Sequence, residues 1–394
     1  MALAGLCLTL LAISSCSEAP SIAPAENAST RLAGLKSTSN LTIETGMNLA
    51  QINAVLAAAS YGQTVYVQPG TYSINGKINF KPGITLTKTG TTPVFDATAQ
   101  ANGLLEMYYT SSISDCIIKN IIFHNIRFKL SNAQNITFYN CVFDYGKRLA
   151  NTDKKYLKDA YINFVQVENG KVNKCTFSRR IGHSGRGIYS SGSTNCRYTN
   201  NTFGDGGATG YFTTAINDNS NATFIGHNTI QRNATWVNTA ETDHGLYCHS
   251  FDGLEIIDNT ISGWPANASG GAVKARNGEN LTIRDNTFST SGILLYTYDH
   301  ATQPFLKHAI IENNTINVAG PANDIYHGIG YWRNTTNGSE YSIRIANNNL
   351  PNGTIKVNFG SLVISDFNAE NGGIFNNNMS TMDLKSGIAQ SGNY

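Results

Sequence analysis

Residues 254–261 read Leu254-Glu255-Ile256-Ile257-Asp258-Asn259-Thr260-Ile261, and residues 281–288, 27 positions later, read Leu281-Thr282-Ile283-Arg284-Asp285-Asn286-Thr287-Phe288. Each stretch is an alternating apolar run closed by Asn, Thr and a large apolar residue, a pattern typical of a β-strand that ends in a bend. The closing phrase occurs nine times, beginning at Cys141, Cys175, Asn201, Asn228, Asn259, Asn286, Asn314, Asn348 and Asn377. Consecutive copies begin 34, 26, 27, 31, 27, 28, 34 and 29 residues apart. The spacing is close to 27 residues, and the longer spacings are explained by inserted loops. A period of this kind indicates a solenoid, and no helical periodicity interrupts it. The sequence therefore predicts an all-β fold, a right-handed parallel β-helix.

The recurring Asn has a structural explanation. Asn tolerates left-handed backbone torsions at a bend, and its amide can bond to neighbouring backbone. In coils stacked about 4.8 Å apart, these amides can also bond to one another. Cys141 and Cys175 occupy the same place in earlier coils, so we expect them to be small buried apolar residues.

The N-terminal region divides into three parts. Residues 1–15 are apolar and too short to span a membrane, so they are predicted to be a signal peptide. The run Ile13-Ser14-Ser15-Cys16 resembles a bacterial lipobox, which implies cleavage before Cys16 and lipidation of its thiol. Residues 16–44 are predicted to be a flexible tether, and residues 45–394 to be the β-helix domain. Cys16 would thus anchor the protein at the bacterial cell envelope, in the periplasm or on the outer surface, with ordinary secretion as the alternative.

The segment from Met47 to Ala59 has helical spacing and is followed by Gly62. We expect it to be an N-terminal capping helix that covers the open end of the β-helix. The strand Thr64-Val65-Tyr66-Val67 and the following turn resemble the entry of pectate-lyase-like β-helix proteins. This resemblance implies the fold and no particular activity.

Counting back from each Asn gives residues that should stack on one face of successive coils. Twelve positions back are Tyr189, Ile216, Tyr247 and Lys274, and ten positions back are Ser191, Asp218, His249 and Arg276. The residues between them are mostly small or apolar and should point inward, so these two columns should point outward. The prediction is an outward cluster of Tyr247, Lys274, His249 and Arg276, flanked by His244 and Arg186.

This cluster offers the groups that elimination at a uronic acid glycoside needs. The reaction must neutralise a carboxylate, remove the C5 proton and protonate the departing oxygen. We expect Arg276, with His249 or His244, to neutralise the carboxylate. Lys274 is the expected base and Tyr247 the expected acid, although the two could exchange. Neighbouring cations should push both of them toward their deprotonated forms. The alternative is that these side chains only form a solvated polar face.

Aromatic residues accompany the cluster. We expect Trp236 and Trp264 to lie on its insertions and later coils to present Tyr296, Tyr298, Tyr331, Trp332 and Arg333 beside it. Aromatic faces suit stacking on sugar rings, and cations suit a polyanionic chain. Together with Arg186, Tyr189 and Asp218, these aromatic side chains are the predicted substrate-binding residues, with ordinary loop packing as the alternative for each aromatic.

The run from Asp243 to Tyr247, followed one coil later by Gly270 to Asn277, resembles the β-helix polysaccharide lyases. It is most similar to the alginate lyases of polysaccharide lyase family 31, in which a Tyr and a Lys on neighbouring coils transfer the protons. The resemblance implies that Tyr247 and Lys274 form this pair and that Arg276 and the histidines hold carboxylates. Family 6 lyases, which use Lys with Arg and calcium, share the architecture and remain open.

Three other functions compete with a lyase that acts on alginate or another acidic uronate polymer. A polygalacturonase-like hydrolase needs two or three carboxylates at the scissile bond, and the predicted face carries cations instead. A mannuronan C5-epimerase would use nearly the same residues as a lyase. A surface carbohydrate-binding solenoid would need no catalytic groups, and one scaffold can host any of these functions.

The composition sets the remaining expectations. The chain has 394 residues, of which 14% are charged, and a formal net charge of +2. So small a basic excess argues against binding of nucleic acid. Asp218, Glu241 and Asp243 are too few and too scattered to favour calcium, so we expect no cofactor. We expect a monomer whose partners are an acidic polysaccharide and, through Cys16, a membrane.

Overall fold

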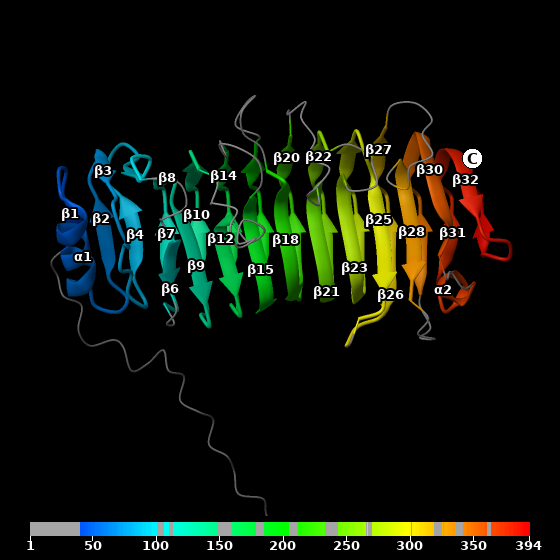
Figure 1. Ribbon diagram of the computed structural model, residues 1–394, viewed down its shortest axis with the longest axis horizontal. Coiled ribbons are helices and arrows are strands. Elements are labelled where there is room, and N and C mark those ends of the chain that lie inside the picture. The colour runs from blue at the N-terminus through cyan, green and yellow to red at the C-terminus, as the bar shows by residue number, and fades with distance from the viewer. Residues whose placement is uncertain are drawn as a thin grey trace, which may run out of the picture. The chain divides into compact units, whose positions relative to one another are not determined.

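The computed structural model describes residues 40–100, 106–109, 113–147, 159–178, 185–204, 212–232, 243–264, 266, 270–300, 302–318, 325, 327–335, 342–360 and 364–394. The described residues from Asn40 onward belong to one compact unit. Within this unit, successive coils are stacked along one axis, with every strand pairing in parallel with a strand of the next coil (Figure 1). The chain is a right-handed parallel β-helix, which confirms the fold predicted from the repeat.

Three ladders of parallel strands run along the β-helix. The first ladder carries the predicted cluster. It consists of β6 (Glu106–Tyr109), β9 (Arg127–Ser131), β12 (Ala160–Val165), β15 (Arg186–Thr194), β18 (Thr214–Asn221), the first halves of β21 (Asp243–Ile257) and β23 (Gly270–Arg284), β25 (Ile293–Tyr298), β28 (Gly328–Asn334), and the later parts of β30 (Asn349–Gly360) and β32 (Asn378–Leu384).

The second ladder contains β1 (Leu41–Ile43), β2 (Thr64–Val67), β4 (Thr85–Lys88), β7 (Ile117–Lys119), β10 (Thr137–Tyr139), β13 (Lys171–Asn173), β16 (Arg197–Thr199), β19 (Thr223–Gly226), the second halves of β21 and β23, β26 (Leu306–Glu312), β29 (Ile343–Ala346), β31 (Gly373–Phe375) and β33 (Gln390–Ser391).

The third ladder contains β3 (Thr71–Ser73), β5 (Val94–Asp96), β8 (Ile122–His124), β11 (Val142–Asp144), β14 (Thr176–Phe177), β17 (Thr202–Phe203), β20 (Thr229–Gln231), β22 (Thr260–Ser262), β24 (Thr287–Ser289), β27 (Thr315–Asn317), the start of β30 and β32 (Asn378–Leu384). The last copy of the repeat, which begins at Asn377, leads into the start of β32, and the rest of β32 and all of β33 come after it.

A helix lies at the N-terminal end of the β-helix, as the spacing from Met47 to Ala59 predicts (Figure 1). Helix α1 (Leu49–Ala58) begins with Asn48, whose side chain accepts a hydrogen bond from the backbone N–H of Gln51 at 3.0 Å. Its buried residues, Ile52 and Leu56, belong to the apolar core. Strand β1 precedes this helix and pairs with β2, so the β-helix begins inside the range 16–44 predicted to be a tether. A second short helix, α2 (Ser365–Asn368), lies near the C-terminal coils, and no described helix is both long enough and apolar enough to cross a membrane.

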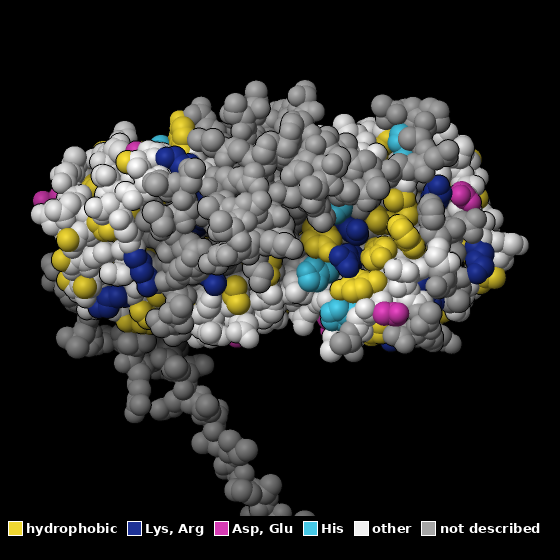
Figure 2. Space-filling model, in the orientation of Figure 1, with side chains coloured by type: hydrophobic (Ala, Val, Ile, Leu, Met, Phe, Trp, Pro, Cys, Tyr) yellow, Lys and Arg dark blue, Asp and Glu magenta, His cyan; other side chains and the backbone are white. Residues whose placement is uncertain are grey.

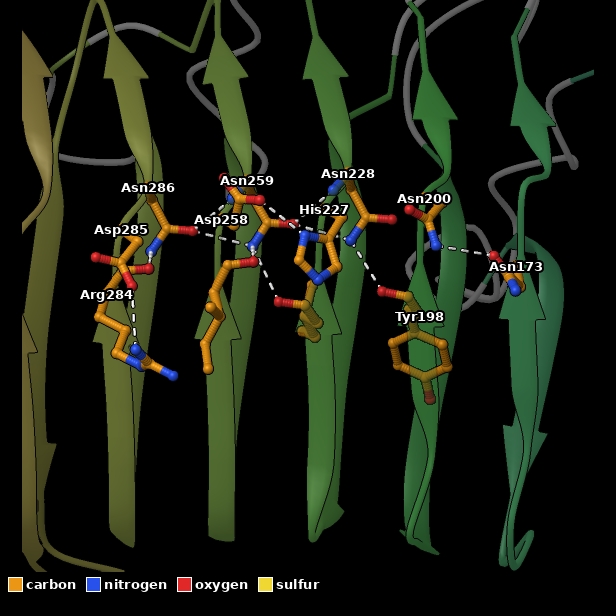
Figure 3. A network of polar contacts seen from close by, with 12 residues as sticks. Asn173, Tyr198, Asn200, His227, Asn228, Asp258, Asn259, Arg284, Asp285 and Asn286 are labelled. Carbon is orange, nitrogen blue, oxygen red and sulfur yellow. Dashed lines mark hydrogen bonds and ion pairs between the residues drawn. The ribbon is translucent and has the colours of Figure 1, made fainter.

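The recurring Asn residues form a continuous chain of buried amides along the core (Figure 3). Each Nδ2 donates to the Oδ1 of the Asn one coil further on, at 2.9 to 3.0 Å, from Asn201 through Asn228, Asn259, Asn286, Asn314, Asn348 and Asn377 to Asn393. The same Nδ2 also donates to a backbone carbonyl of the preceding coil, as Asn228 does to Tyr198 at 2.9 Å. We call this chain the Asn ladder. Both polar atoms of each buried amide in the ladder thereby have a hydrogen-bond partner.

One detail of the predicted bend was wrong. The ladder Asn residues do not adopt the left-handed conformation; the residue before each of them does. This preceding residue has a φ between 53° and 59° at Asn200, His227, Asp258, Asp285, Asn313, Asn347 and Asn376. The bend is therefore made by two consecutive residues, one that reverses the backbone and one whose amide points into the core.

Aromatic stacking connects the two coils before the Asn ladder to the first coil of the ladder. Phe143, Phe177 and Phe203 follow Cys141, Cys175 and Asn201 by two positions and stack face to face, with centroid distances of 5.0 and 4.6 Å. Cys141 and Cys175 are 1% exposed, which confirms that they are buried apolar residues. The N-terminal coils thus rely on apolar packing at the bend, and the later coils rely on hydrogen bonds.

We predict that Asn259→Ala lowers the free energy of unfolding by about 3 kcal/mol or more, because it leaves buried backbone groups without partners. Asn259 Nδ2 donates to the carbonyl of Ile225 at 2.9 Å, and its Oδ1 accepts from the backbone N–H of Asn228 at 3.0 Å. Denaturant unfolding followed by circular dichroism would measure the change.

Thr260→Ala is the matched control, because Thr260 is the next residue and its side chain is exposed. It should change the unfolding free energy by no more than about 0.5 kcal/mol. Equal effects of the two substitutions would contradict a stabilising role for the Asn ladder.

Candidate active site

The predicted cluster forms on the first ladder, between the coils that carry β21 and β23. In the register of these two strands, Tyr247 lies opposite Lys274 and His249 lies opposite Arg276, as the count from the repeat predicts. All four side chains are partly exposed, on the side of the strands opposite to buried Cys248 and Ala275. Tyr247 and Lys274, which can both transfer protons, thereby lie on adjacent coils beside the permanent cation Arg276.

Arg276 is held by three aromatic side chains from the coils before and after its own. Its Nη1 donates a hydrogen bond to the hydroxyl of Tyr247. Its guanidinium carbon lies 4.3 Å from the ring centroid of Tyr298, 5.4 Å from that of Tyr296 and 5.7 Å from that of Tyr247. Cation–π contacts of this kind fix the guanidinium without neutralising its charge.

Lys274 is a base with a lowered proton affinity. Partial burial, aided by the positive charge of Arg276, lowers the pKa of Lys274 to about 8. Its Nζ lies 5.0 Å from the ring centroid of Tyr296. A much larger fraction of Lys274 is therefore neutral near physiological pH than for a solvated lysine.

The pKa of Tyr247 shifts in the direction opposite to our prediction. Burial raises the pKa of this phenol above its usual value, and this effect exceeds the lowering effect of the Arg276 charge and hydrogen bond. We expected neighbouring cations to drive Tyr247 toward its ionised form, but its desolvation dominates. Tyr247 therefore keeps its proton at neutral pH.

His249 is neutral at physiological pH. Burial and the charges of Arg276, His300 and Arg186 lower the pKa of His249 to about 4. Its ring lies 5.5 Å from that of Tyr247. His249 can offer a hydrogen bond to a substrate, but it does not supply the positive charge that we expected of it.

His244 lies behind Tyr247 and away from the surface. Its side chain is completely buried, and burial lowers its pKa well below the usual value. The imidazole stacks on the ring of Tyr247 with a centroid distance of 5.4 Å and an interplanar angle of 15°. The prediction that His244 neutralises a carboxylate was therefore wrong, because a buried neutral ring neither reaches a bound polymer nor carries charge.

Asp218 is in the core and is not a substrate-binding residue. It lies between Ser190 and Cys248 in the inward-facing register and is completely buried. Its coil has one residue fewer between Asn219 and Asn221 than the previous coil has between Ser191 and Thr194. Counting back from Asn228 therefore assigns the wrong face, because a shift of one residue reverses the direction of every side chain.

The same correction applies to Ile216 in the other column. The residue opposite Tyr247 on the preceding coil is Asn217, whose Nδ2 donates to the carbonyl of Tyr247 at 2.8 Å. Ile216 pairs with Leu246 and is fully buried.

Three aromatic or charged side chains predicted to line the cluster belong to the interior. Trp264 is 1% exposed and its Nε1 donates to the carbonyl of Thr213 at 3.3 Å. Tyr331 and Arg333 are also buried, and both bond to the carboxylate of Asp366, at 3.1 and 2.7 Å. These side chains support the core, and a polymer on the outside cannot stack on them. Trp236 and Cys16 lie outside the described residues.

The other predicted binding residues do lie beside the cluster. Tyr296 and Trp332 follow Arg276 in register on the next two coils, and their rings meet at right angles, 5.6 Å apart. Trp332 is 39% exposed, which leaves part of its indole free for contact with a ligand. On the other side, the guanidinium of Arg186 lies 5.7 Å from the ring of partly exposed Tyr189. Figure 2 shows basic and histidine side chains gathered among hydrophobic ones, over the region where Figure 1 labels β21 to β28.

Three residues that contribute to the cluster were missed in the sequence. Asn217 was missed because its coil is one residue shorter than the previous coil at this place, so the count from Asn228 gave Ile216 instead. His300 follows β25 in a segment outside the repeat, and its ring lies 5.8 Å from that of Tyr298. Asn334, on β28, also reaches the cluster and donates to the hydroxyl of Tyr296 at 3.2 Å. Only the proximity of a His to the Tyr296–Tyr298 pair could have suggested a role for His300. In the part of the chain that the structure describes, no three His, Cys, Asp or Glu side chains are grouped so as to hold a metal ion.

Comparison with known proteins supports the fold. No family model and no curated protein matches the chain. Among solved structures, it is similar to the surface adhesin PfbA of Streptococcus pneumoniae, with a TM-score of 0.52 and 14% identity over 90% of this chain and 93% of that chain. It is also similar to the alginate lyase AlyF-OU02 in complex with G6, with a TM-score of 0.53 and 14% identity over 90% and 84% of the two chains.

A third similar structure is a mutant tailspike protein of the E. coli bacteriophage HK620 in complex with a pentasaccharide, with a TM-score of 0.50 and 12% identity over 89% of this chain and 64% of that chain. At these identities the likenesses establish a shared parallel β-helix architecture. This architecture occurs in proteins that act on or bind polysaccharides and in adhesins.

We predict that Arg276→Gln raises the pKa of Lys274 toward its usual value, because the substitution removes a neighbouring positive charge. The value should stay below that of a solvated lysine, since burial is the larger cause of the shift. Titration of the Lys274 ε-methylene carbon by NMR would measure it. Arg284→Gln is the control, because Arg284 is exposed on the second ladder, where it pairs with Asp285 at 3.2 Å. An unchanged Lys274 pKa in Arg276→Gln would contradict the coupling.

Proposed function

We propose that this protein is a polysaccharide lyase that cleaves an acidic uronate polymer by β-elimination. One observation carries the proposal: Tyr247 and Lys274 lie opposite each other on adjacent coils, with Arg276 hydrogen-bonded to the Tyr247 hydroxyl. A base, an acid and a fixed cation are the three groups that the elimination requires.

The proton transfers follow from the protonation states of the two residues. Neutral Lys274 removes the C5 proton of a uronate unit, and Arg276 stabilises the negative charge that develops on the carboxylate. The C4–O bond breaks as the C4–C5 double bond forms, and the hydroxyl of Tyr247 donates its proton to the departing oxygen. The products are a new non-reducing end with a C4–C5 double bond and a free hydroxyl on the leaving chain. Lys274 then holds one extra proton and Tyr247 lacks one, so exchange with solvent restores the enzyme.

The pKa shifts favour this assignment of roles over the reverse. Burial lowers the pKa of Lys274 and raises the pKa of Tyr247, so the lysine loses its proton more readily and the tyrosine retains its own. The hydrogen bond from Arg276 lies in position to stabilise the phenolate left after proton donation. We therefore assign Lys274 as the base and Tyr247 as the acid.

The histidines have supporting roles in this mechanism. Buried His244 stacks on Tyr247 and holds its ring in place, so it is a positioning residue. His249, neutral and partly exposed, is available to donate a hydrogen bond to the substrate. Arg276 then carries the task of carboxylate neutralisation that we had divided between it and a histidine.

The surroundings of the cluster suit a chain of charged sugars. Exposed Trp332 and partly exposed Tyr296 offer apolar ring faces on the C-terminal side of Lys274. Arg186 and Tyr189 lie on the N-terminal side, where they could contact a neighbouring sugar unit. The polymer would therefore cross several coils, parallel to the axis of the β-helix.

The choice of alginate as the polymer, and of lyase family 31 over family 6, is part of the proposal. It rests on the Tyr247 and Lys274 motif and is compatible with the architecture shared with an alginate lyase. A mannuronan C5-epimerase remains the main competitor, since it would use the same base and return a proton to C5. A hydrolase is disfavoured, because the one carboxylate predicted for this face, Asp218, lies in the core.

The cellular context stays a prediction. The signal peptide, lipidation at Cys16 and the location at the cell envelope concern residues outside the described part of the chain. We propose that the enzyme acts as a monomer on polymer outside the cytoplasm.

We predict that the protein produces unsaturated ends, seen as rising ultraviolet absorbance, from at least one of alginate, poly-mannuronate, poly-guluronate, pectate and glucuronan. Lys274→Ala should lower kcat by about 10²–10⁴-fold, because it removes the base, and Tyr247→Phe should do so by a similar factor. Lys356→Ala is the matched control, since Lys356 lies in the same column three coils away and should leave the rate unchanged.

The outcomes separate the competing functions. Flat absorbance on every polymer would reject the lyase for these substrates. Exchange of C5 hydrogen with deuterated solvent would then indicate an epimerase, new reducing ends without absorbance would indicate a hydrolase, and binding alone would indicate a carbohydrate-binding solenoid.

The rate should depend strongly on pH. Because the neutral form of Lys274 is the base and its pKa is about 8, kcat should rise about tenfold per pH unit well below 8 and level off above it. Loss of the Tyr247 proton should lower the rate only at a pH above the usual value of a phenol, since burial raises the pKa of Tyr247. A rate that falls between pH 6 and 8 would exclude Lys274 as the base. Initial rates in buffers of constant ionic strength would provide the profile.

A further inference from the structure

The second ladder carries a group of basic side chains on its outer side, in the N-terminal half of the β-helix. Strands β7, β10, β13 and β16 have three residues each, of which the middle one is buried and the other two are partly or fully exposed (β7 and β10 are labelled in Figure 1). Four cations lie on this side, and we call them the basic stripe: Lys119 on β7, Lys171 on β13, Lys174 directly after β13 and Arg197 on β16. The basic stripe is on a different ladder from Lys274, so it is separate from the proposed active site.

The register brings cations of the basic stripe together. Lys171 lies directly opposite Arg197 on the next coil, at the usual spacing of about 4.8 Å between neighbouring strands. On earlier coils, Lys119 lies opposite Tyr139, whose ring centroid is 5.7 Å from the Nζ of Lys174. Like charges directly opposite each other destabilise a sheet. The pairing of Lys171 with Arg197 therefore lowers stability, and the fold itself gives no reason for it.

No carboxylate neutralises the basic stripe within the described part of the chain. None of its four cations forms an ion pair there. The residues that face outward on the second ladder from β2 to β19 include no Asp or Glu. Two acidic residues stand at the bend before this ladder, Asp115 and exposed Glu168. The carboxylate of Asp115 accepts hydrogen bonds from the Tyr61 hydroxyl at 2.7 Å and from Asn135 Nδ2 at 2.6 Å. The positive charge of the basic stripe therefore remains available to a ligand.

The later coils of the second ladder differ, because their charges are mixed. Glu255 faces outward on β21 and is exposed. Near the bend that follows this ladder, His227 Nδ1 lies 2.8 Å from the carboxylate of Asp258, and Arg284 Nη1 lies 3.2 Å from that of Asp285 (Figure 3). Opposite charges thus neighbour each other on the later coils, whereas the earlier strands present cations without acids.

Aromatic and hydroxyl groups accompany these cations. The guanidinium carbon of Arg197 lies 4.3 Å from the ring centroid of Phe224, and both Phe224 and Tyr139 are partly exposed. Thr137 lies opposite Lys171, and Thr199 lies opposite the residue two positions after Lys171. Ring faces can contact sugar rings, and hydroxyls can bond to sugar hydroxyls.

The surface that carries the basic stripe is long and narrow. Its two outward columns are two residues apart, roughly 7 Å, and the five strands from β7 to β19 extend about 19 Å along the axis. A linear polymer fits such a surface along its length, whereas a membrane would rest on a broad one.

We propose that the basic stripe binds a linear anionic polysaccharide, as a second binding site apart from the proposed active site. Acidic groups of the polymer accept hydrogen bonds from Lys171 and Arg197 and relieve the repulsion between them. A chain held there stays close to the protein when it leaves the first ladder, since linked contacts raise the effective concentration of each. This binding requires no elimination, so it goes beyond the proposed function and stands even if the lyase is rejected.

Isothermal titration of the full chain with alginate tests the proposal, with Lys274→Ala present in every sample so that the polymer stays intact. Lys171→Glu combined with Arg197→Glu should weaken alginate binding by about tenfold or more, and added salt should reduce this difference, because the attraction is electrostatic. Arg284→Glu combined with Arg344→Glu is the matched control. It changes the net charge by the same amount on later coils of the same ladder and should weaken binding by no more than about twofold.

Three outcomes would overturn the proposal. Unchanged binding in Lys171→Glu with Arg197→Glu would show that the basic stripe takes no polymer. Equal weakening by the control pair would show that net charge alone explains the effect. The same titration with vesicles of anionic phospholipid should be insensitive to these substitutions, and a greater loss on vesicles than on alginate would assign the stripe to a membrane surface instead.

Lys171→Gln is a milder variant with a second measurement. Because it removes one of two opposed charges, it should raise the midpoint of thermal unfolding while it weakens alginate binding. A residue with a purely structural role would lower the midpoint when replaced. A lower midpoint with unchanged binding would therefore overturn the proposal.

Discussion

The structure depends on keeping successive coils in register, and the Asn ladder is the interaction that enforces this register. Each amide donates to the amide of the next coil and to a backbone carbonyl of the previous one, so a coil cannot slip without exposing buried polar groups to an apolar core. Register in turn decides which side chains point outward. Tyr247 therefore lies opposite Lys274 on the first ladder because of hydrogen bonds made elsewhere, at the bend between the other two ladders.

Burial has opposite effects on the two residues that we assign to proton transfer, and both effects are useful. It disfavours the charged form of each, which is the protonated form of Lys274 and the deprotonated form of Tyr247. A neutral base and a neutral acid thus lie one coil apart, beside the permanent charge of Arg276. The aromatic rings around Arg276 hold this charge in place, and among the described residues no carboxylate pairs with it, so it remains available to a substrate carboxylate.

The repeat predicted most of the fold, and its failures have physical causes. The spacing of Asn and Cys residues predicted the coils, the ladder and the positions of Tyr247 and Lys274, because hydrogen bonding and alternation leave a period in the sequence. Asp218 was assigned to the wrong face because a single missing residue before Asn221 leaves no sign in the spacing of the Asn residues. Tyr331 was misplaced because aromatic residues suit both the core and a sugar-binding face. The direction of the Tyr247 pKa shift was wrong because burial, which decides it, is not visible in the sequence.

The direction of the Asn ladder also bears on how such a protein can change in length. Every ladder amide donates in the same direction along the axis. Each coil therefore presents an Nδ2 donor to the next coil and an Oδ1 acceptor to the previous one, as its neighbours do. Duplication or loss of one entire coil would join a donor to an acceptor again and leave the chain of amides unbroken. Loss of part of a coil would not. Length can thus be gained or lost in whole-coil units, and the face on which the polymer is proposed to lie would lengthen or shorten in the same units.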